Sequence, residues 1–326
     1  MIARFLQVER NAALLLLTSA VLGLATANLG GAGLIHQIEQ ARFGFTFHEW
    51  LNEVLLGGFF LLIGLELKRE LTIGAFKNRL ALVVPGLAAL LGAAVPAAVF
   101  FLLTQNDQAI AKGWAIPMAT DVTFALAVFS IFGSHWLPEA RAFLLSFAVL
   151  DDLLAVFVIA LFVGGGVQPA VLFAIAGLLV PAKWAPKLED RLHPWVALVI
   201  LPLFAFFAAA IDLAGGFAIG TALALAILIR PLGKIVGITV GAWLGRLALG
   251  RRIDSKLSLP QYLRISVLGG IGFTVALLIA DLSYGAGSQA SGTAKVATLV
   301  AAVVSMALGA LALNLGIKES SKMNQK

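Results

Sequence analysis

Long apolar segments follow one another along nearly the whole chain, separated by short polar stretches. They lie near residues 12–29, 54–71, 80–104, 113–132, 142–163, 168–182, 195–212, 216–244, 263–284 and 292–316. A hydrocarbon core about 30 Å thick requires about 20 apolar residues of helix, so most of these segments are long enough to cross it. Segments 54–71 and 168–182 are short for a crossing. The pattern predicts an all-α polytopic membrane protein with about ten transmembrane helices.

Composition agrees with this interpretation. Of the 326 residues 60% are hydrophobic and only 12% are charged, with a mean hydropathy of +0.99. A soluble domain of this length could not cover so much apolar surface. The longest polar stretches, 30–50 and 245–262, are too short for a second domain, so we expect residues 1–326 to form a single integral membrane domain. The absence of cysteine excludes disulfides and thiolate chemistry.

The basic residues predict the orientation, because cytoplasmic loops are rich in Lys and Arg. If the N-terminus is cytoplasmic and there are ten spans, 18 of the 23 Lys and Arg residues fall on the cytoplasmic side. Only Arg42, Lys112 and Lys295 fall outside, and Arg230 and Lys234 lie within a span. This asymmetry accounts for the net charge of +6 and predicts that both chain ends are cytoplasmic.

Three carboxylates interrupt apolar segments: Asp121 in 113–132, and Asp151 with Asp152 in 142–163. A charge at the centre of a bilayer costs about 2.5–3.5 kcal/mol on insertion scales. At 1.5 Å per residue, Asp121 lies about 12 Å from one face and Asp151 about 15 Å from the other, so both approach the midplane. We interpret them as a functional site; the alternative is that they pair with cations and only hold helices together.

Two spans carry signs of interruption at the same depth. Pro117 and Thr120 precede Asp121 in the fourth span, and a glycine-rich stretch, Gly269 to Thr274, lies in the ninth. Spans four and nine are therefore predicted to be discontinuous helices that surround a midplane site. Arg230 and Lys234 are the mid-membrane cations available to it, and because they are four residues apart they share a helix face.

The chemistry of this group of residues indicates ion exchange. Carboxylate oxygens suit hard, unpolarisable cations, while burial and a neighbouring negative charge favour the protonated form of a carboxyl group. A proton and a metal ion then compete for the same oxygens.

Several motifs, in the same order along the chain, resemble those of bacterial NhaA-type sodium/proton antiporters. They are FFLLIGLELKREL (59–71), AIPMATDVTFALAVF (115–129), LDDL (150–153), LEDRLHPW (188–195), ILPLFAF (200–206) and GGIGFT (269–274). The resemblance implies NhaA-like inverted repeats and secondary active exchange of cytoplasmic Na⁺ or Li⁺ for external protons. It also implies pH regulation and a multi-pass location in the bacterial inner membrane. The transported ions would be Na⁺ or Li⁺ and H⁺, with no cofactor and no enzymatic activity.

The resemblance also implies roles for individual residues. Asp152 matches the main cation ligand and proton carrier, with Asp151 beside it, so the two would bind Na⁺. Asp121 and Thr120 match residues that balance helix ends at the break. Arg230 stands where the family has a mid-membrane lysine before Pro-Leu-Gly, and Lys234 follows one turn later. Since arginine keeps its proton, a proton-carrying role would have to fall to Lys234.

A second group of residues matches the family's pH-sensing cluster at the cytoplasmic surface. Its members are Glu66, Lys68, Arg69, Glu70, Glu189, Asp190 and His193. The alternative is ordinary interfacial charge that contributes to the cytoplasmic signal.

The chain departs from the family pattern in three places. The family has twelve spans, but residues 162–169 here pass almost directly from the fifth span to what resembles the family's eighth, so two helices are missing. Gln168 stands in place of a histidine linked to the pH response. Loop 30–50 is short for the family's dimerising β-hairpin, which argues against a homodimer without excluding one.

Two other functions stay open from the sequence. One is a cation channel without proton coupling, and the other is a shortened homologue impaired in transport. A membrane enzyme is disfavoured, because no His-rich metal motif or Ser/His/Asp arrangement stands out. The remaining partner is the lipid bilayer, and nothing in the sequence points to a nucleic acid.

Overall fold

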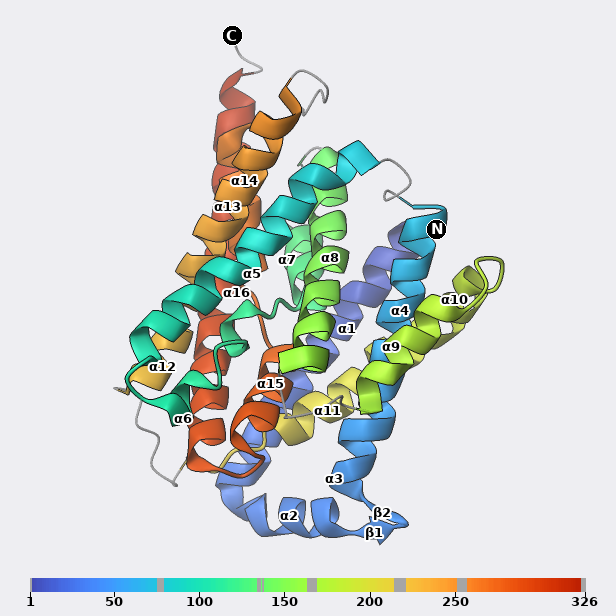
Figure 1. Ribbon diagram of the computed structural model, residues 1–326, viewed down its shortest axis with the longest axis vertical. Helices are drawn as coiled ribbons and strands as arrows, with labels where there is room; N and C mark the ends of the chain where they lie inside the picture. Colours follow the sequence, from blue (N-terminus) through green and yellow to red (C-terminus); the bar gives the residue numbers. More distant parts are fainter. Residues whose placement is uncertain are drawn as a thin grey trace.

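The computed structural model describes residues 2–74, 79–133, 136, 138–162, 169–213, 221–250 and 257–323, and they are overwhelmingly helical (Figure 1). The α-helices are α1 (Ile2–Thr26), α2 (Ala32–Gln40), α3 (Phe47–Glu49), α4 (Leu56–Thr72), α5 (Val83–Thr104), α6 (Gln108–Ala111), α7 (Val122–Phe132), α8 (Pro138–Phe162), α9 (Pro169–Leu179), α10 (Ala185–Trp195), α11 (Leu201–Ala208), α12 (Ala222–Leu228), α13 (Arg230–Leu249), α14 (Leu259–Gly269), α15 (Thr274–Tyr284) and α16 (Gln289–Met323). Wider π turns occupy Ala27–Gly31, Trp50–Leu55 and Val196–Ile200, and tighter 3₁₀ turns occupy Arg79–Leu82 and Ile116–Met118. The all-α membrane fold is confirmed.

Six described helical stretches are long and apolar enough to cross a bilayer, and up to eight if each bent pair counts as one span. These eight correspond to eight of the ten predicted segments. The other two predicted segments, 54–71 and 168–182, contain α4 and α9. α4 continues the helical stretch that begins at Phe47, so its length is sufficient, but it carries Glu66, Lys68, Arg69 and Glu70. α9 has 11 residues, fewer than a straight crossing requires, so the count of ten rests on one charged helix and one short one.

Two helix boundaries differ from the predicted ones. The predicted segment 195–212 belongs to a helical stretch that begins ten residues earlier, at Ala185, because α10 is amphipathic and too polar for hydropathy to reveal it. The predicted segment 216–244 contains two helices, α12 and α13, which meet beside Pro231. Proline has no N–H to donate, so the helical hydrogen-bond ladder is interrupted there.

The helices place the chain ends at one pole of the molecule. The start of α1, the end of α16 and the start of α5 lie in the upper half of Figure 1, whereas α2, the β-strands and the turn between α15 and α16 lie at the bottom. The basic residues Lys77, Arg251, Arg252, Lys256 and Lys326 lie outside the described residues. Which pole is cytoplasmic stays a prediction.

Residues 30–50 are folded despite their short length. They contain α2 and an antiparallel hairpin of two two-residue strands, β1 (Arg42–Phe43) and β2 (Phe45–Thr46). Gly44 forms its turn with a φ of +83°, a conformation that favours glycine. Thr46 and Glu49 then form a capping box at the start of α3. A hairpin is thus present, in a reduced form; the homodimer stays an open prediction.

Close helix packing holds the charged helices in place. A Cβ atom at Gly237 of α13 would collide with the carbonyl oxygen of Leu91 of α5, and one at Gly64 of α4 with that of Ala174 of α9. Small residues at such contacts let helix backbones approach closely in a membrane. As a result α13, which carries Arg230 and Lys234, lies directly against α5.

Candidate functional site

Two interrupted spans meet in the middle of the molecule. Residues Gln108–Met118 and α7 are bent by 41° at one break, and α14 and α15 by 54° at the other. The two breaks are joined directly, because the backbone N–H of Asp121 donates to the carbonyl of Ile271 at 2.7 Å. Discontinuity of the fourth and ninth spans is therefore confirmed. We call this meeting point the crossing, formed by residues 119–121 and 269–274.

Asp121 lies at the N-terminal ends of two half-helices. Its Oδ2 accepts hydrogen bonds from Thr274 Oγ1 at 2.8 Å and from the Thr274 N–H at 3.3 Å, at the start of α15. Its Oδ1 accepts from the N–H of Phe124 at 3.5 Å, in the first turn of α7. Helix N-termini carry partial positive charge. One buried carboxylate thus compensates two helix ends.

Arg230 compensates the opposite kind of helix end. Its Nη2 donates to the carbonyls of Gly272 at 2.9 Å and Gly270 at 3.4 Å, just beyond the C-terminus of α14. Helix C-termini carry partial negative charge, which a cation offsets. The Arg230 side chain is 1% exposed, and its Nε and Nη1 have no hydrogen-bond partner among the described residues.

Lys234 forms a buried ion pair with Asp151. Its Nζ lies 3.1 Å from Oδ1 and 3.0 Å from Oδ2 of Asp151, and the two side chains are 0% and 2% exposed. Lys234 also donates to the hydroxyl of Thr120, which in turn donates to the carbonyl of Gly269 at 2.9 Å. Lys234, Asp151, Thr120 and the end of α14 therefore form one connected network.

Asp152, the next residue on α8, is placed differently. Its carboxylate makes no hydrogen bond or ion pair to any of the described residues, although the charges of Glu66, Asp121, Asp151 and Lys234 all act on it. Adjacent helical residues point about 100° apart, so Asp152 faces away from the Lys234 pair. In the described part of the chain, no group of three His, Asp or Glu side chains could hold a resident metal ion.

The predicted surface cluster is brought together only in part. Arg69 on α4 lies 3.1 Å from the carboxylate of Glu70 and 3.0 Å from that of Glu189 on α10. The charge of Asp190 acts on Glu189, and the charges of Arg69 and Asp190 act on His193. Glu66 instead lies within electrostatic reach of Asp152. The side chain of Lys68 forms no ion pair with the described residues of the cluster, and its backbone carbonyl accepts a hydrogen bond from the Thr72 hydroxyl.

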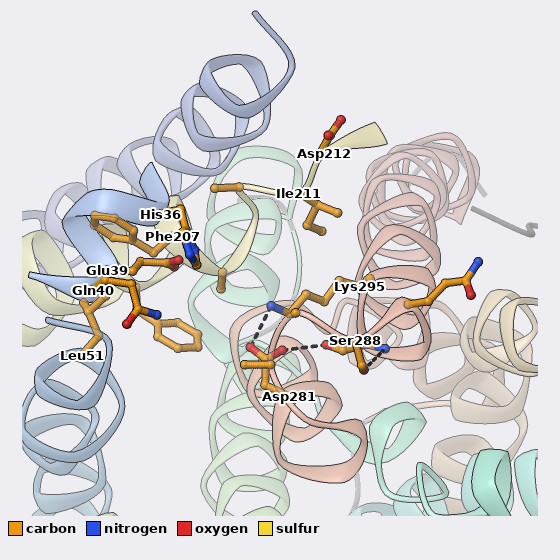
Figure 2. A pocket seen from close by; sticks show the side chains of 18 residues that line it. His36, Glu39, Gln40, Leu51, Phe207, Ile211, Asp212, Asp281, Ser288 and Lys295 are labelled. Carbon is orange, nitrogen blue, oxygen red and sulfur yellow. Dashed lines mark hydrogen bonds and ion pairs between the residues drawn. The ribbon is translucent and has the colours of Figure 1, made fainter. Parts of the chain in front are cut away.

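One polar feature was not anticipated. A cavity of about 830 Å³ opens at the pole opposite the chain ends, and its walls carry His36, Glu39, Asp212, Asp281 and Lys295 (Figure 2). The sequence predicts only that Lys295 lies in an external segment. The signal that points to this feature is Asp281, an acidic residue near the end of the apolar segment 263–284.

The fold and site together define a polytopic membrane protein with a charged centre where two broken helices meet. This arrangement is typical of secondary transporters, NhaA among them. Comparison with known proteins identifies the family: the model described as Na+/H+ antiporter 1 matches residues 3–185 and 163–313. The chain belongs to the NhaA-type sodium/proton antiporter family.

Several curated relatives match the chain over nearly its full length. The Na(+)/H(+) antiporter NhaA of Proteus mirabilis is 30% identical over 395 aligned positions, covering 100% of this chain and 99% of the relative. The NhaA of Vibrio cholerae is 32% identical and covers 97% and 98%. NhaA 1 of Saccharopolyspora erythraea is 33% identical and covers 95% and 90%. These relatives are named as antiporters, and Na⁺ and H⁺ are the ions that their names give.

The alignments also show that this chain is shortened. The 395 aligned positions exceed its 326 residues, so the Proteus relative contains residues that this chain lacks. The two stretches matched by the family model meet within residues 163–185, next to the predicted loss after the fifth span. That two whole helices are missing stays a prediction, and Gln168 lies outside the described residues.

Proposed function

We propose that this protein is a secondary active antiporter that exchanges cytoplasmic Na⁺ or Li⁺ for external protons through Asp152 and Asp151. The observation that carries the proposal is the contrast between two adjacent carboxylates at the crossing. Asp151 is held by Lys234, whereas Asp152 has no bonded partner in the described chain. A carboxylate without a bonded partner, deep in a membrane protein, is available to either a proton or a hard cation.

In this mechanism Asp152 releases its proton and provides the first oxygens for the incoming ion. Binding by both aspartates requires Lys234 to leave Asp151, because Lys234 contacts both of its carboxylate oxygens. The arriving cation would repel the ammonium group of Lys234, and a lysine can release a proton when its partner is lost. The reverse events return the site to the state seen here: sodium leaves and Lys234 and Asp152 are protonated again.

Arg230 has a different role in the proposal. It keeps its charge at ordinary pH, and its contacts are to backbone carbonyls at the end of α14. We assign it to holding the crossing together and assign proton exchange to Lys234. The two functions that one family lysine would combine are thus divided between two residues on one face of α13.

We further propose that the Arg69 cluster adjusts transport to pH. Arg69 links α4 to α10 through Glu189, and Glu66, one turn before Glu70 on α4, acts electrostatically on Asp152. A change of charge in the cluster would therefore reach the ion site along a single helix. We place the protein in the bacterial inner membrane with both chain ends cytoplasmic, following the distribution of Lys and Arg.

The test uses everted membrane vesicles with an imposed pH gradient. Addition of Na⁺ or Li⁺ should dissipate the gradient, and Asp152→Asn should abolish this response because the remaining amide cannot exchange a proton. Asp107→Asn, which changes an exposed carboxylate at the start of α6, is the matched control and should retain exchange.

The outcomes separate the candidate functions. Exchange that survives Asp152→Asn would overturn the assignment of the site. A folded wild-type protein without exchange would favour the shortened, transport-impaired homologue, and sodium flux without proton movement would favour the channel.

A further inference from the structure

The cavity at the pole opposite the chain ends has a polar inner wall. Of its charged residues, His36 and Glu39 come from α2, Asp212 follows α11, Asp281 belongs to α15 and Lys295 to α16. Figure 2 shows Lys295 and Asp281 pointing toward each other at the cavity wall, joined by a dashed line. If the chain ends are cytoplasmic, this cavity opens to the outside.

Asp281 ties α15 to α16 by two contacts. Its Oδ2 lies 2.7 Å from Lys295 Nζ, and its Oδ1 accepts a hydrogen bond from Ser291 Oγ at 2.6 Å. The side chains of Asp281 and Lys295 are 13% and 12% exposed. At this exposure an ion pair is more than a solvated surface contact, because little water competes for its charges.

Asp281 also lies in line with the crossing. Thr274, which donates two hydrogen bonds to Asp121, and Asp281 are seven residues apart, so they lie on one face of α15 about 10 Å apart along its axis. Leu277 and Leu278 lie between them and are 0% and 5% exposed. The cavity therefore stops at Asp281, and two buried leucines separate it from the crossing.

We propose that the Asp281–Lys295 pair is an external latch on the ion pathway, which makes Asp281 a positioning residue for exchange; this rests on the proposed antiport. While the pair is closed, α15 is held against α16 and Leu277 and Leu278 block the route from the cavity to Asp121. Release of Lys295 lets α15 swing about the break at Gly270–Phe273. The cavity then deepens toward the crossing, where protons arrive and sodium leaves.

The geometry explains why α15 is the element that moves. Its N-terminus follows three residues, Ile271 to Phe273, that are not helical, so it is not continuous with α14. Its C-terminus ends at Gly285, whose φ is +84°, a conformation that favours glycine. With a break at each end, α15 is held largely by side-chain contacts, and among these the Asp281–Lys295 pair faces the cavity.

The first experiment measures access to α15 from outside. The chain has no cysteine, so Leu277→Cys gives a single thiol beneath the latch, and a membrane-impermeant thiol reagent is added to right-side-out vesicles. Labelling should be slow with the latch intact. It should be about fivefold faster with Asp281→Asn or Lys295→Gln, because loss of the pair shifts the population toward the open state.

Two controls make the result specific. Ala286→Cys places a thiol in the exposed turn at the cavity rim and should react at one rate in every background, which also checks which pole is external. The exchanged pair Asp281→Lys with Lys295→Asp should restore slow labelling of Leu277→Cys, because it restores the attraction. Leu278→Cys replaces the first reporter if that variant does not fold.

The same variants separate this proposal from the proposed function. In an Asp152→Asn background exchange is lost, but Asp281→Asn should still accelerate labelling, because the latch does not depend on the ion site. Labelling that is unchanged by Asp281→Asn and by Lys295→Gln would overturn the latch. Failure of wild-type exchange together with faster labelling would reject the antiport and leave the latch in place.

Discussion

Two ion pairs in this molecule use the same chemistry in opposite surroundings. The Lys234 and Asp151 side chains are 0% and 2% exposed at the crossing, whereas those of Arg69 and Glu189 are 42% and 9% exposed. A buried pair costs several kcal/mol of desolvation per ion and repays it only while both partners are present. A pair with one partner partly in water loses less on burial and is partly screened by salt. The Lys234–Asp151 pair therefore depends on both partners, or on an ion that takes the place of Lys234, whereas the Arg69–Glu189 pair is more open to the surrounding solution.

The largest effect is expected from removing one partner of the buried pair. Lys234→Met leaves Asp151 without its cation and should lower the free energy of unfolding by about 3–5 kcal/mol, as measured by denaturant unfolding in detergent. Lys187→Met, on the exposed side of α10, is the control and should change stability little. A loss below about 1 kcal/mol for Lys234→Met would show that the pair is not a buried one in the membrane.

Removing both charges sharpens the same point. Lys234→Met with Asp151→Asn should regain most of the lost stability, because no buried charge is left unpaired. Exchange in everted vesicles should stay absent, since the proton-exchanging lysine is gone. If the double variant transports ions, the assignment of proton exchange to Lys234 is wrong.

An intermediate effect is expected at the helix ends. Asp121→Asn removes the negative charge shared by the starts of α7 and α15 and should cost about 1–2 kcal/mol of unfolding free energy. Asp107→Asn, at the exposed start of the short α6, should cost less than about 1 kcal/mol. Equal losses at the two positions would contradict the idea that Asp121 serves two helices.

The smallest effect on stability is expected at the Arg69–Glu189 pair, because Arg69 is 42% exposed. Arg69→Gln leaves the buried Glu189 without its cation and should lower the free energy of unfolding by about 1 kcal/mol, less than Lys234→Met. Loss of this cation lets neighbouring groups keep their protons to higher pH, so the pH profile of exchange should move to higher pH. A stable variant with an unmoved profile would leave the cluster as ordinary interfacial charge.

The crossing was accessible from the sequence because its signals are local. Pro117 and Thr120 before Asp121, and the glycines of 269–274, mark interruptions within apolar segments wherever those segments pack. The sequence could not predict that Lys234 pairs with Asp151 while Arg230 binds backbone carbonyls. The two cations share one face of α13, and only the packing of α13 against α14 and α8 gives them different partners. The polar start of the helix at Ala185 was missed for a different reason, because hydropathy detects burial in lipid rather than helical structure.

The Asp281–Lys295 pair shows what is missed when the sequence is interpreted one span at a time. Asp281 and Lys295 lie in consecutive segments joined by a tight turn, and their attraction became visible only once α15 and α16 were placed together. In the sequence, each of the two residues is simply a charged residue near the end of a predicted span. The distance between them is a property of the turn, not of either segment.

The hydroxyl of Thr120 links two events that are otherwise separate. It has one hydrogen, which it gives to Gly269, and it receives one from Lys234. When Lys234 departs, the Thr120 oxygen loses a donor that polarises it. The hydrogen bond from the Thr120 hydroxyl to the carbonyl of Gly269, the last residue of α14, then weakens. The Thr120 side chain thus couples the position of Lys234 to the break between α14 and α15, about which α15 is proposed to move.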